Sequence, residues 1–131
     1  MSKPAAKQGD KVIAVDIHII QPPGPVPPVP IPHPFNGMLV NGLSANVLIQ
    51  GMPAATLGSV AMNVPPHIPQ GGTFIKPPLN QGRIIMGSTT VLINNKPAAR
   101  LGDPVMTCND PADLPVGKVV VVGAPTVLIG G

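Results

Sequence analysis

Two stretches of the sequence decide the fold, because the second repeats the first without a gap. Val47-Leu48-Ile49-Gln50-Gly51-Met52-Pro53-Ala54-Ala55-Thr56-Leu57-Gly58 returns as Val91-Leu92-Ile93-Asn94-Asn95-Lys96-Pro97-Ala98-Ala99-Arg100-Leu101-Gly102. A third Val-Leu-Ile occupies positions 127–129, and a glycine stands shortly before each copy, at Gly42, Gly87 and Gly123. The repeat predicts three similar units, each built as strand, glycine-containing turn and strand.

The residue types between and around these copies predict an all-β fold with little or no helix. Val, Ile and Thr dominate short runs bounded by Gly, Pro and Asn, which is typical of strands and turns. Stretches with helical periodicity are interrupted by Pro or Gly. Three longer connections are expected at residues 18–34, 63–82 and 103–117. The first has eight prolines within residues 21–34, which predicts a stiff polyproline II path.

Composition limits the chain to one folded domain, expected over residues 1–131 with enlarged proline-rich loops at about 18–34 and 63–82. The chain has 131 residues, of which 44% are hydrophobic and only 10% charged. Such a chain folds around a core or lies against a partner, although it holds 15 glycines and 20 prolines.

The basic residues that give the net charge of +3 are scattered along the chain, and Phe35 and Phe74 are the only Phe, Tyr or Trp residues. Both features argue against nucleic-acid binding.

The sequence shows neither a secretory leader nor a membrane span. Asp16 and His18 interrupt the apolar stretch at residues 12–20, and no segment reaches the roughly 18 apolar residues that a span requires. We therefore expect synthesis in the cytoplasm without a signal peptide and export, if any, by a route that reads none. Cys108 is the single cysteine, which excludes an intrachain disulfide.

All the metal-binding imidazole and thiol groups fall in or beside the three long loops. They are His18, His33, His67 and Cys108. If the strands run up and down, these loops meet at one pole, where three imidazoles and a thiolate could form a tetrahedral zinc site. The alternative, that they are solvated loop histidines and a small buried thiol, stays open at this point.

Catalytic alternatives are less well supported by the residues. A catalytic zinc site keeps one position open for water and often has a glutamate as base, whereas this chain has no glutamate and its four candidates fill all positions. Asp110 in a Cys-Asn-Asp-Pro turn is better explained as a cap of backbone groups. A nucleophilic pair of Cys108 and His67 lacks an identifiable Asn or Asp to orient the imidazole. We expect no catalytic residues and no enzyme activity.

Several short motifs of the sequence resemble those of the PAAR-repeat family. Pro97-Ala98-Ala99-Arg100 followed by Leu101-Gly102-Asp103-Pro104 and Cys108 looks like the motif that names the family, and Pro53-Ala54-Ala55 begins a degenerate second copy. Gly9-Asp10 ahead of His18 resembles the family's opening segment. The resemblance implies a small cone of short strands with pseudo-threefold symmetry, whose point holds one structural zinc ion. Carried over by position, the ligands are His18, His33, His67 and Cys108.

The resemblance also implies a function and a partner. Such cones cap the trimeric β-helical spike of contractile injection machines (type VI secretion systems, phage tails and extracellular particles) and help it to pierce a target envelope. This chain resembles a bare tip without an effector extension, so any effector cargo would bind noncovalently. It would end outside the producing cell or inside the target, after transient contact with the target membrane. The alternative function is an effector- or adaptor-binding module that presents the proline-rich loops as polyproline II ligands.

The opposite pole is expected to dock on the spike. If the long loops form the point, the short turns and the strand ends of the three Val-Leu-Ile copies form the base. One chain with three pseudo-equivalent units can match three identical chains, which predicts one tip per trimer. The docking residues expected at the base are Val47, Leu48, Val91, Leu92, Val127 and Leu128.

Overall fold

The structure, a computed structural model, describes residues 2–123 and 125–130. Every regular element in this part of the chain is a strand, which confirms the all-β prediction. No helix long and apolar enough to cross a membrane occurs among the described residues. The strands in chain order are β1 (Lys3–Pro4), β2 (Lys11–Gln21), β3 (Val29–Asn41), β4 (Leu48–Ile49), β5 (Met52–Pro53), β6 (Val60–Asn63), β7 (Thr73–Phe74), β8 (Gln81–Ile84), β9 (Leu92–Ile93), β10 (Lys96–Pro97), β11 (Pro104–Thr107), β12 (Leu114–Val120) and β13 (Leu128–Ile129).

Six of these strands form a closed antiparallel sheet in the middle of the molecule. The order is β12, β11, β8, β6, β3 and β2, and β12 pairs again with β2 to close the ring. Alternate side chains point inward, and the interior holds fully buried apolar groups such as Val12, Leu39 and Val105 around Phe35. Gly37 leaves room for that ring, since a Cβ atom there would lie 2.6 Å from Cε1 of Phe35.

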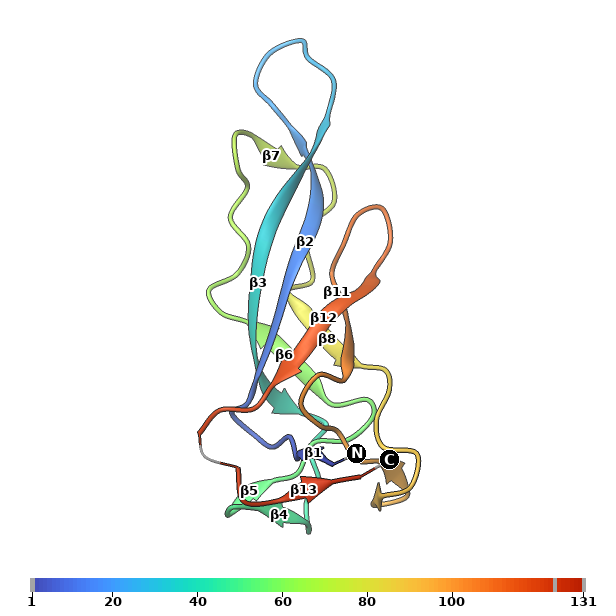
Figure 1. Ribbon diagram of the computed structural model, residues 1–131. Coiled ribbons are helices and arrows are strands. Elements are labelled where there is room, and N and C mark those ends of the chain that lie inside the picture. Colours follow the sequence, from blue (N-terminus) through green and yellow to red (C-terminus); the bar gives the residue numbers. More distant parts are fainter. Residues whose placement is uncertain (1, 124, 131) are drawn as a thin grey trace.

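Three short hairpins form the broad end of the molecule, which we call the base (Figure 1). They are β4–β5, β9–β10 and β13–β1, and they share one register: Leu48 faces Pro53, Leu92 faces Pro97, and Leu128 faces Pro4. The third hairpin joins the two ends of the chain, because its strands are β13 and β1. The sequence analysis recognised Val127-Leu128-Ile129 and missed its partner Lys3-Pro4-Ala5-Ala6, which is a third copy of the proline-alanine-alanine word.

The opposite end is narrow and is formed by the long β2–β3 hairpin (Figure 1). The prediction of a polyproline II loop at residues 18–34 is wrong, because β2 continues to Gln21 and β3 begins at Val29. Only residues 22–28 connect the strands. His18 and His33 therefore lie on strands and not in a loop. The connections at 63–82 and 103–117 are likewise shorter than expected, since they contain β7, the start of β8, β11 and part of β12.

The prolines of β3 are compatible with a strand because of their spacing. Asn36 directs its backbone N–H away from β2, donating to Oδ1 of Asn63 at 2.9 Å. Pro30, Pro32 and Pro34 share the parity of Asn36, so the N–H that each lacks belongs to the edge that does not pair with β2. Proline is tolerated in a strand at such an edge.

Candidate metal centre

Two adjacent strands direct three polar side chains into the interior of the narrow half. In the β2–β3 pair, Asp16 lies opposite His33 and His18 lies opposite Ile31. Side chains two residues apart on a strand share a face, so Asp16 and His18 point inward together with His33 from the facing strand. Their exposed fractions are 0%, 1% and 1%.

His67 joins this group from the connection between β6 and β7. Its backbone N–H donates to Oδ1 of Asn80 at 2.8 Å, and the same oxygen accepts a hydrogen bond from Nδ2 of Asn63 at 3.1 Å. Asn63 and Asn80 therefore hold the backbone of the β6–β7 connection in place at His67. Its imidazole points inward, and His67 is buried.

Cys108 joins the group from the segment that follows β11. The next two residues attach this segment to the edge of β2: Oδ1 of Asn109 accepts the N–H of Ile17 at 2.7 Å, and Oδ2 of Asp110 accepts the N–H of Ile19 at 2.9 Å. The N–H of Asp110 donates in turn to the carbonyl of Ile17 at 2.8 Å. Asp110 thus binds backbone groups, as its turn sequence predicts.

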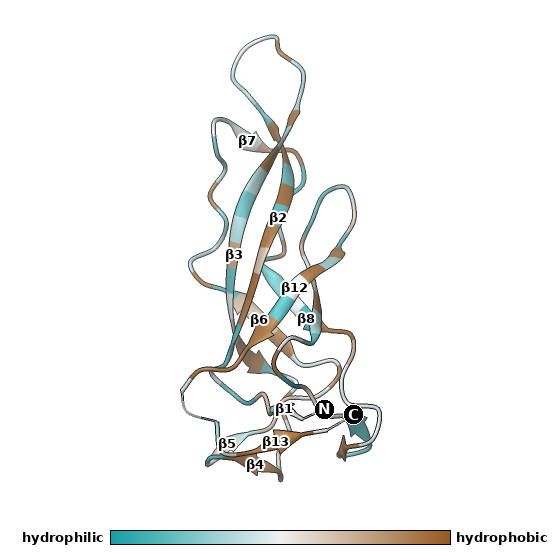
Figure 2. Cartoon of the chain, viewed as in Figure 1, coloured by the Kyte–Doolittle hydropathy of each residue, from teal (hydrophilic) through white to brown (hydrophobic). Residues whose placement is uncertain are grey.

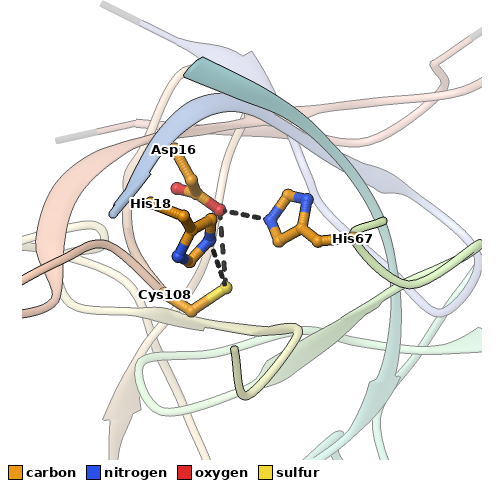
Figure 3. A group of neighbouring side chains, drawn as sticks. All are labelled: Asp16, His18, His67 and Cys108. Atoms are coloured by element: carbon orange, nitrogen blue, oxygen red, sulfur yellow. Dashed lines mark hydrogen bonds and ion pairs between the residues drawn. The ribbon is translucent and has the colours of Figure 1, made fainter. Parts of the chain in front are cut away.

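The side chains converge on the carboxylate of Asp16 (Figure 3). Its Oδ2 atom lies 2.9 Å from Nε2 of His67 and 3.5 Å from Sγ of Cys108. That sulfur is 3.9 Å from Nε2 of His18. One ligand atom of each of these four buried residues lies within 4.8 Å of the others, a grouping that could hold a metal ion. The separations suit four ligands at metal-bond lengths of about 2.0–2.3 Å.

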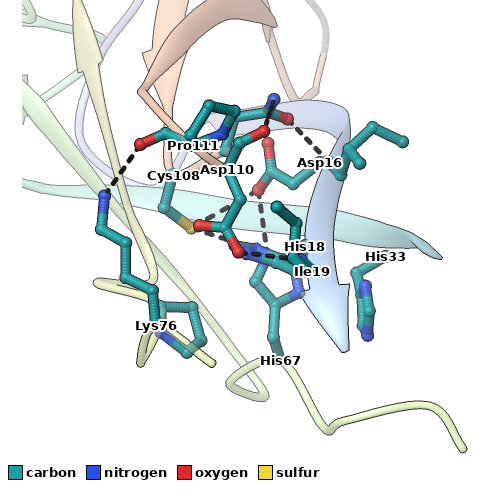
Figure 4. Close-up of polar contacts among 12 residues, drawn as sticks. Asp16, His18, Ile19, His33, His67, Lys76, Cys108, Asp110 and Pro111 are labelled. Carbon is teal, nitrogen blue, oxygen red and sulfur yellow. Dashed lines mark hydrogen bonds and ion pairs between the residues drawn. The ribbon is translucent and has the colours of Figure 1, made fainter. Parts of the chain in front are cut away.

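His33 lies beside this group, and its ligand atom is not part of it (Figure 4). Its ring centroid is 5.3 Å from that of His18 and 5.7 Å from that of His67. Nδ1 is 2.9 Å from the carbonyl of Ile31, to which it can donate its hydrogen. Nε2 is buried and has no hydrogen-bond partner among the residues that the structure describes. In that tautomer Nε2 carries a free lone pair, which is the form that binds a metal.

Three of the four ligands expected from the sequence are thus brought together, namely His18, His67 and Cys108, with His33 adjacent. The ligand set of three histidines and a cysteine stays a prediction. Asp16 was missed. Its signal in the sequence is its position two residues before His18 on the same strand, which places both on one face.

The family comparison agrees with this architecture. Residues 76–131 match the family model described as PAAR motif. This segment carries a PAAR motif. The matched segment contains Pro97-Ala98-Ala99-Arg100, Cys108 and the last Val-Leu-Ile. Comparison with curated proteins gave no match.

Burial controls the protonation of His18 and Cys108 in the centre. Desolvation, followed by the nearby imidazole of His67, lowers the pKa of His18, against a smaller opposing effect of Asp110. His18 is therefore a neutral imidazole, the form that ligates metals.

Desolvation and the carboxylate of Asp16 raise the pKa of Cys108 to about 11. A thiol with this pKa is protonated at neutral pH, the opposite of what a nucleophilic cysteine requires. A bound cation would displace that proton.

Proposed function

We propose that this protein is the tip of a spike in a contractile injection machine, where one chain caps a trimeric β-helical spike. The PAAR motif over residues 76–131 supports the class of protein. Export would then be by the machine itself, so that the tip acts outside the producing cell or within the target.

The observation that carries this proposal is the threefold repetition of exposed leucines at the base. Leu48, Leu92 and Leu128 stand at equivalent positions of the three hairpins, and each is 60% exposed. Figure 2 shows the hydrophobic colour of β4 and β13 along this end. The isoleucine that follows each leucine is buried, at 5%, 8% and 5% exposed. The isoleucines hold the hairpins together and leave the leucines for a partner with threefold symmetry.

The valines of the same repeat support the docking surface in a different way. Val127 is 38% exposed, whereas Val47 and Val91 are half-buried and pack on the cluster that contains Ile49 and Ile93. We expect the leucines to make the main contacts with the spike and the valines to set the spacing of the hairpins.

We further propose that the metal centre holds one zinc ion, with His18, His33, His67 and Cys108 as its ligands. The buried, unpartnered Nε2 of His33 supports its membership, because a buried polar atom without a partner lowers stability unless an ion binds it. Such an ion would lock β2 and β3 to the segments that carry His67 and Cys108. These segments lie where the cone is too narrow for a larger apolar core.

The end of the β2–β3 hairpin supports a role in penetrating an envelope. No charged residue occurs between Ile17 and Phe35. In the connecting residues 22–28, only Gly24 and Val26 have a backbone N–H, and that of Val26 donates to the carbonyl of Gly24 at 3.0 Å. Nε2 of Gln21 donates to the carbonyl of Val26 at 2.8 Å. The absence of charge and the small number of free N–H groups lower the cost of moving this loop into hydrocarbon, although its free carbonyl groups still lose water there.

The docking proposal is tested by mixing the purified protein with a candidate trimeric spike protein from the same organism and measuring the mass of the complex. We expect one tip per trimer. Leu92→Asp should abolish the complex without unfolding the tip, since the side chain is already exposed. The matched control is Leu114→Asp on the flank of β12, where the leucine is 44% exposed. A complex of three tips per trimer, or unchanged binding of Leu92→Asp, would contradict the proposal.

A second candidate function, display of the hairpin loop to an effector or adaptor, is favoured by the exposure of residues 23–28. Replacing residues 22–28 by a short Gly-containing turn separates the two functions. Loss of cargo with docking retained would support the binding module, and unchanged cargo loading would reject it.

A further inference from the structure

Asp16 is a buried carboxylate that has no lysine or arginine partner in the part of the chain that the structure describes. Among the described residues, Asp10 pairs with Lys7 at 2.9 Å and Asp103 pairs with Arg100 at 3.0 Å. Within residues 2–123 and 125–130, Asp16 forms an ion-pair contact only with His67, at 2.9 Å, and its exposed fraction is 0%. A buried anion without a compensating cation is strongly destabilising. The carboxylate of Asp16 therefore needs compensation from its surroundings.

Both oxygens of Asp16 are used within the metal centre. Oδ1 accepts a hydrogen bond from Oγ1 of Thr107 at 2.5 Å. This bond fixes the carboxylate so that Oδ2 faces Nε2 of His67 and Sγ of Cys108, at 2.9 and 3.5 Å. The charge is therefore directed at the space where an ion would bind (Figure 3).

The charges of a bound divalent ion and its ligands explain why a carboxylate lies here. A divalent ion held by three neutral imidazoles and one thiolate keeps a net charge of +1 in a buried site. A second buried carboxylate, that of Asp110, lies 3.4 Å from Nδ1 of His18 and accepts the N–H of Ile19. The carboxylate that faces the sulfur and the imidazole of His67 is that of Asp16, and its charge reduces the net charge of this inner group of ligands to zero.

We propose, resting on the metal centre of the proposed function, that Asp16 is the acidic member of that centre and makes it neutral around a divalent cation. Asp16 acts as a positioning and charge-compensating residue: it contacts His67 and Cys108 and sets the charge of the ion that the site prefers. The surroundings that hold it are Thr107 and the backbone of β2.

The test compares a divalent with a monovalent thiophilic ion. Affinities of the full-length, metal-stripped protein for Zn²⁺ and Ag⁺ are measured by competition with chelators of known affinity. Asp16→Asn keeps the size of the side chain and one acceptor oxygen while removing the charge. We expect Zn²⁺ to bind about 10–100-fold more weakly and Ag⁺ to bind as in the wild type or more tightly. A thiolate with a monovalent ion is already neutral, so it does not need the carboxylate.

Two controls separate charge from structure. Thr107→Val removes the hydrogen bond to Oδ1 and keeps the charge, so the ratio of Zn²⁺ to Ag⁺ affinity should stay near that of the wild type. Asp103→Asn removes a buried carboxylate of the base and should leave both metal affinities unchanged. If Asp16→Asn does not fold, the smaller neutral variant Asp16→Ser gives the same comparison.

Equal weakening of both ions in Asp16→Asn would mean that Asp16 only maintains the structure and would overturn the proposal, as would unchanged Zn²⁺ affinity. A wild type that binds neither ion would instead reject the metal centre itself. Docking to the trimeric spike is measured separately, and its failure would reject the proposed function and leave the role of Asp16 standing.

Discussion

The backbone N–H of Ala6 donates to the carbonyl oxygen of Ala99 at 2.9 Å, linking the first and last copies of the repeated word. Ala99 donates to Ala55, and Ala55 donates to Ala6, both at 3.0 Å. The three hydrogen bonds close a ring in which each unit gives one bond and receives one. All three alanines are fully buried. The residue after the proline-alanine pair must therefore be small, because three copies of it meet at the same place.

Enlarging one member of this ring should destabilise the whole base. We expect Ala99→Leu to lower the free energy of unfolding by about 1–3 kcal/mol or more, because there is no space for added carbons in a packed core. Chemical denaturation followed by circular dichroism measures this. The control is Ala45→Leu in an exposed turn, which should change the stability by less than about 0.5 kcal/mol. Equal effects of the two substitutions would contradict the packing described for the ring.

Removing the metal should loosen the narrow half of the molecule. Elemental analysis of the purified protein should give one zinc per chain, and a chelator should lower Tm by more than about 10 °C, since each kcal/mol shifts Tm by several degrees in a domain of this size. Cys108→Ser should lose the ion and reproduce the low Tm. Purified protein without stoichiometric zinc, or with iron in its place, would count against the zinc centre.

The metal-free protein should lose stability as the pH falls. The pKa of His18 in the folded chain is below its ordinary value of 6.5, so the unfolded chain binds a proton more readily than the folded one. The stabilisation is present above about pH 6.5 and decreases as the pH falls through the lower pKa of the folded state. Unfolding curves at pH 7.5 and 5.0 measure this, with His18→Gln expected to reduce the difference. Equal stability at both pH values would argue against a neutral, buried His18.

Restoring backbone donors to the hairpin loop should hinder its entry into a bilayer. Val26→Trp supplies a fluorescent reporter in a chain that has no tryptophan, and quenching by brominated zwitterionic lipid vesicles reports its depth. With this reporter, replacing Pro23, Pro25 and Pro27 by alanine should reduce quenching, because three free N–H groups are added. Met86→Lys, at an exposed site outside the hairpin, should leave quenching unchanged. Equal quenching of the alanine variant and the reporter alone would reject this explanation of the loop.

Much of the base could be predicted from the sequence, since the repeated words at 47–58 and 91–102 each contain both strands of a hairpin. The third hairpin could not, because its strands stand at opposite ends of the chain and only Val127-Leu128-Ile129 was recognised. The pairing of Leu128 with Pro4 is a tertiary contact, and a search for contiguous repeats does not detect it.

The metal centre was predicted in part for a similar reason. His18, His67 and Cys108 were grouped by residue type, whereas Asp16 was read only as an interruption of an apolar run. The prolines at 30, 32 and 34 suggested a loop, because proline weakens a strand in general. Their common parity, which leaves the bonds to β2 intact, becomes visible only when the neighbouring strand is known.

The course of the β2–β3 hairpin has a mechanical consequence. β2 runs from the closed sheet toward the narrow end as one strand of 11 residues, a length of about 36 Å at roughly 3.3 Å per residue. A push applied at the base therefore travels to the point along two continuous covalent chains, and hydrogen bonds between strands need only keep these chains from bending apart. Under such a load the covalent bonds of the two strands do not break, so the strands can fail only by buckling. The hydrogen bonds beside them, and an ion bound in the metal centre, would resist that buckling.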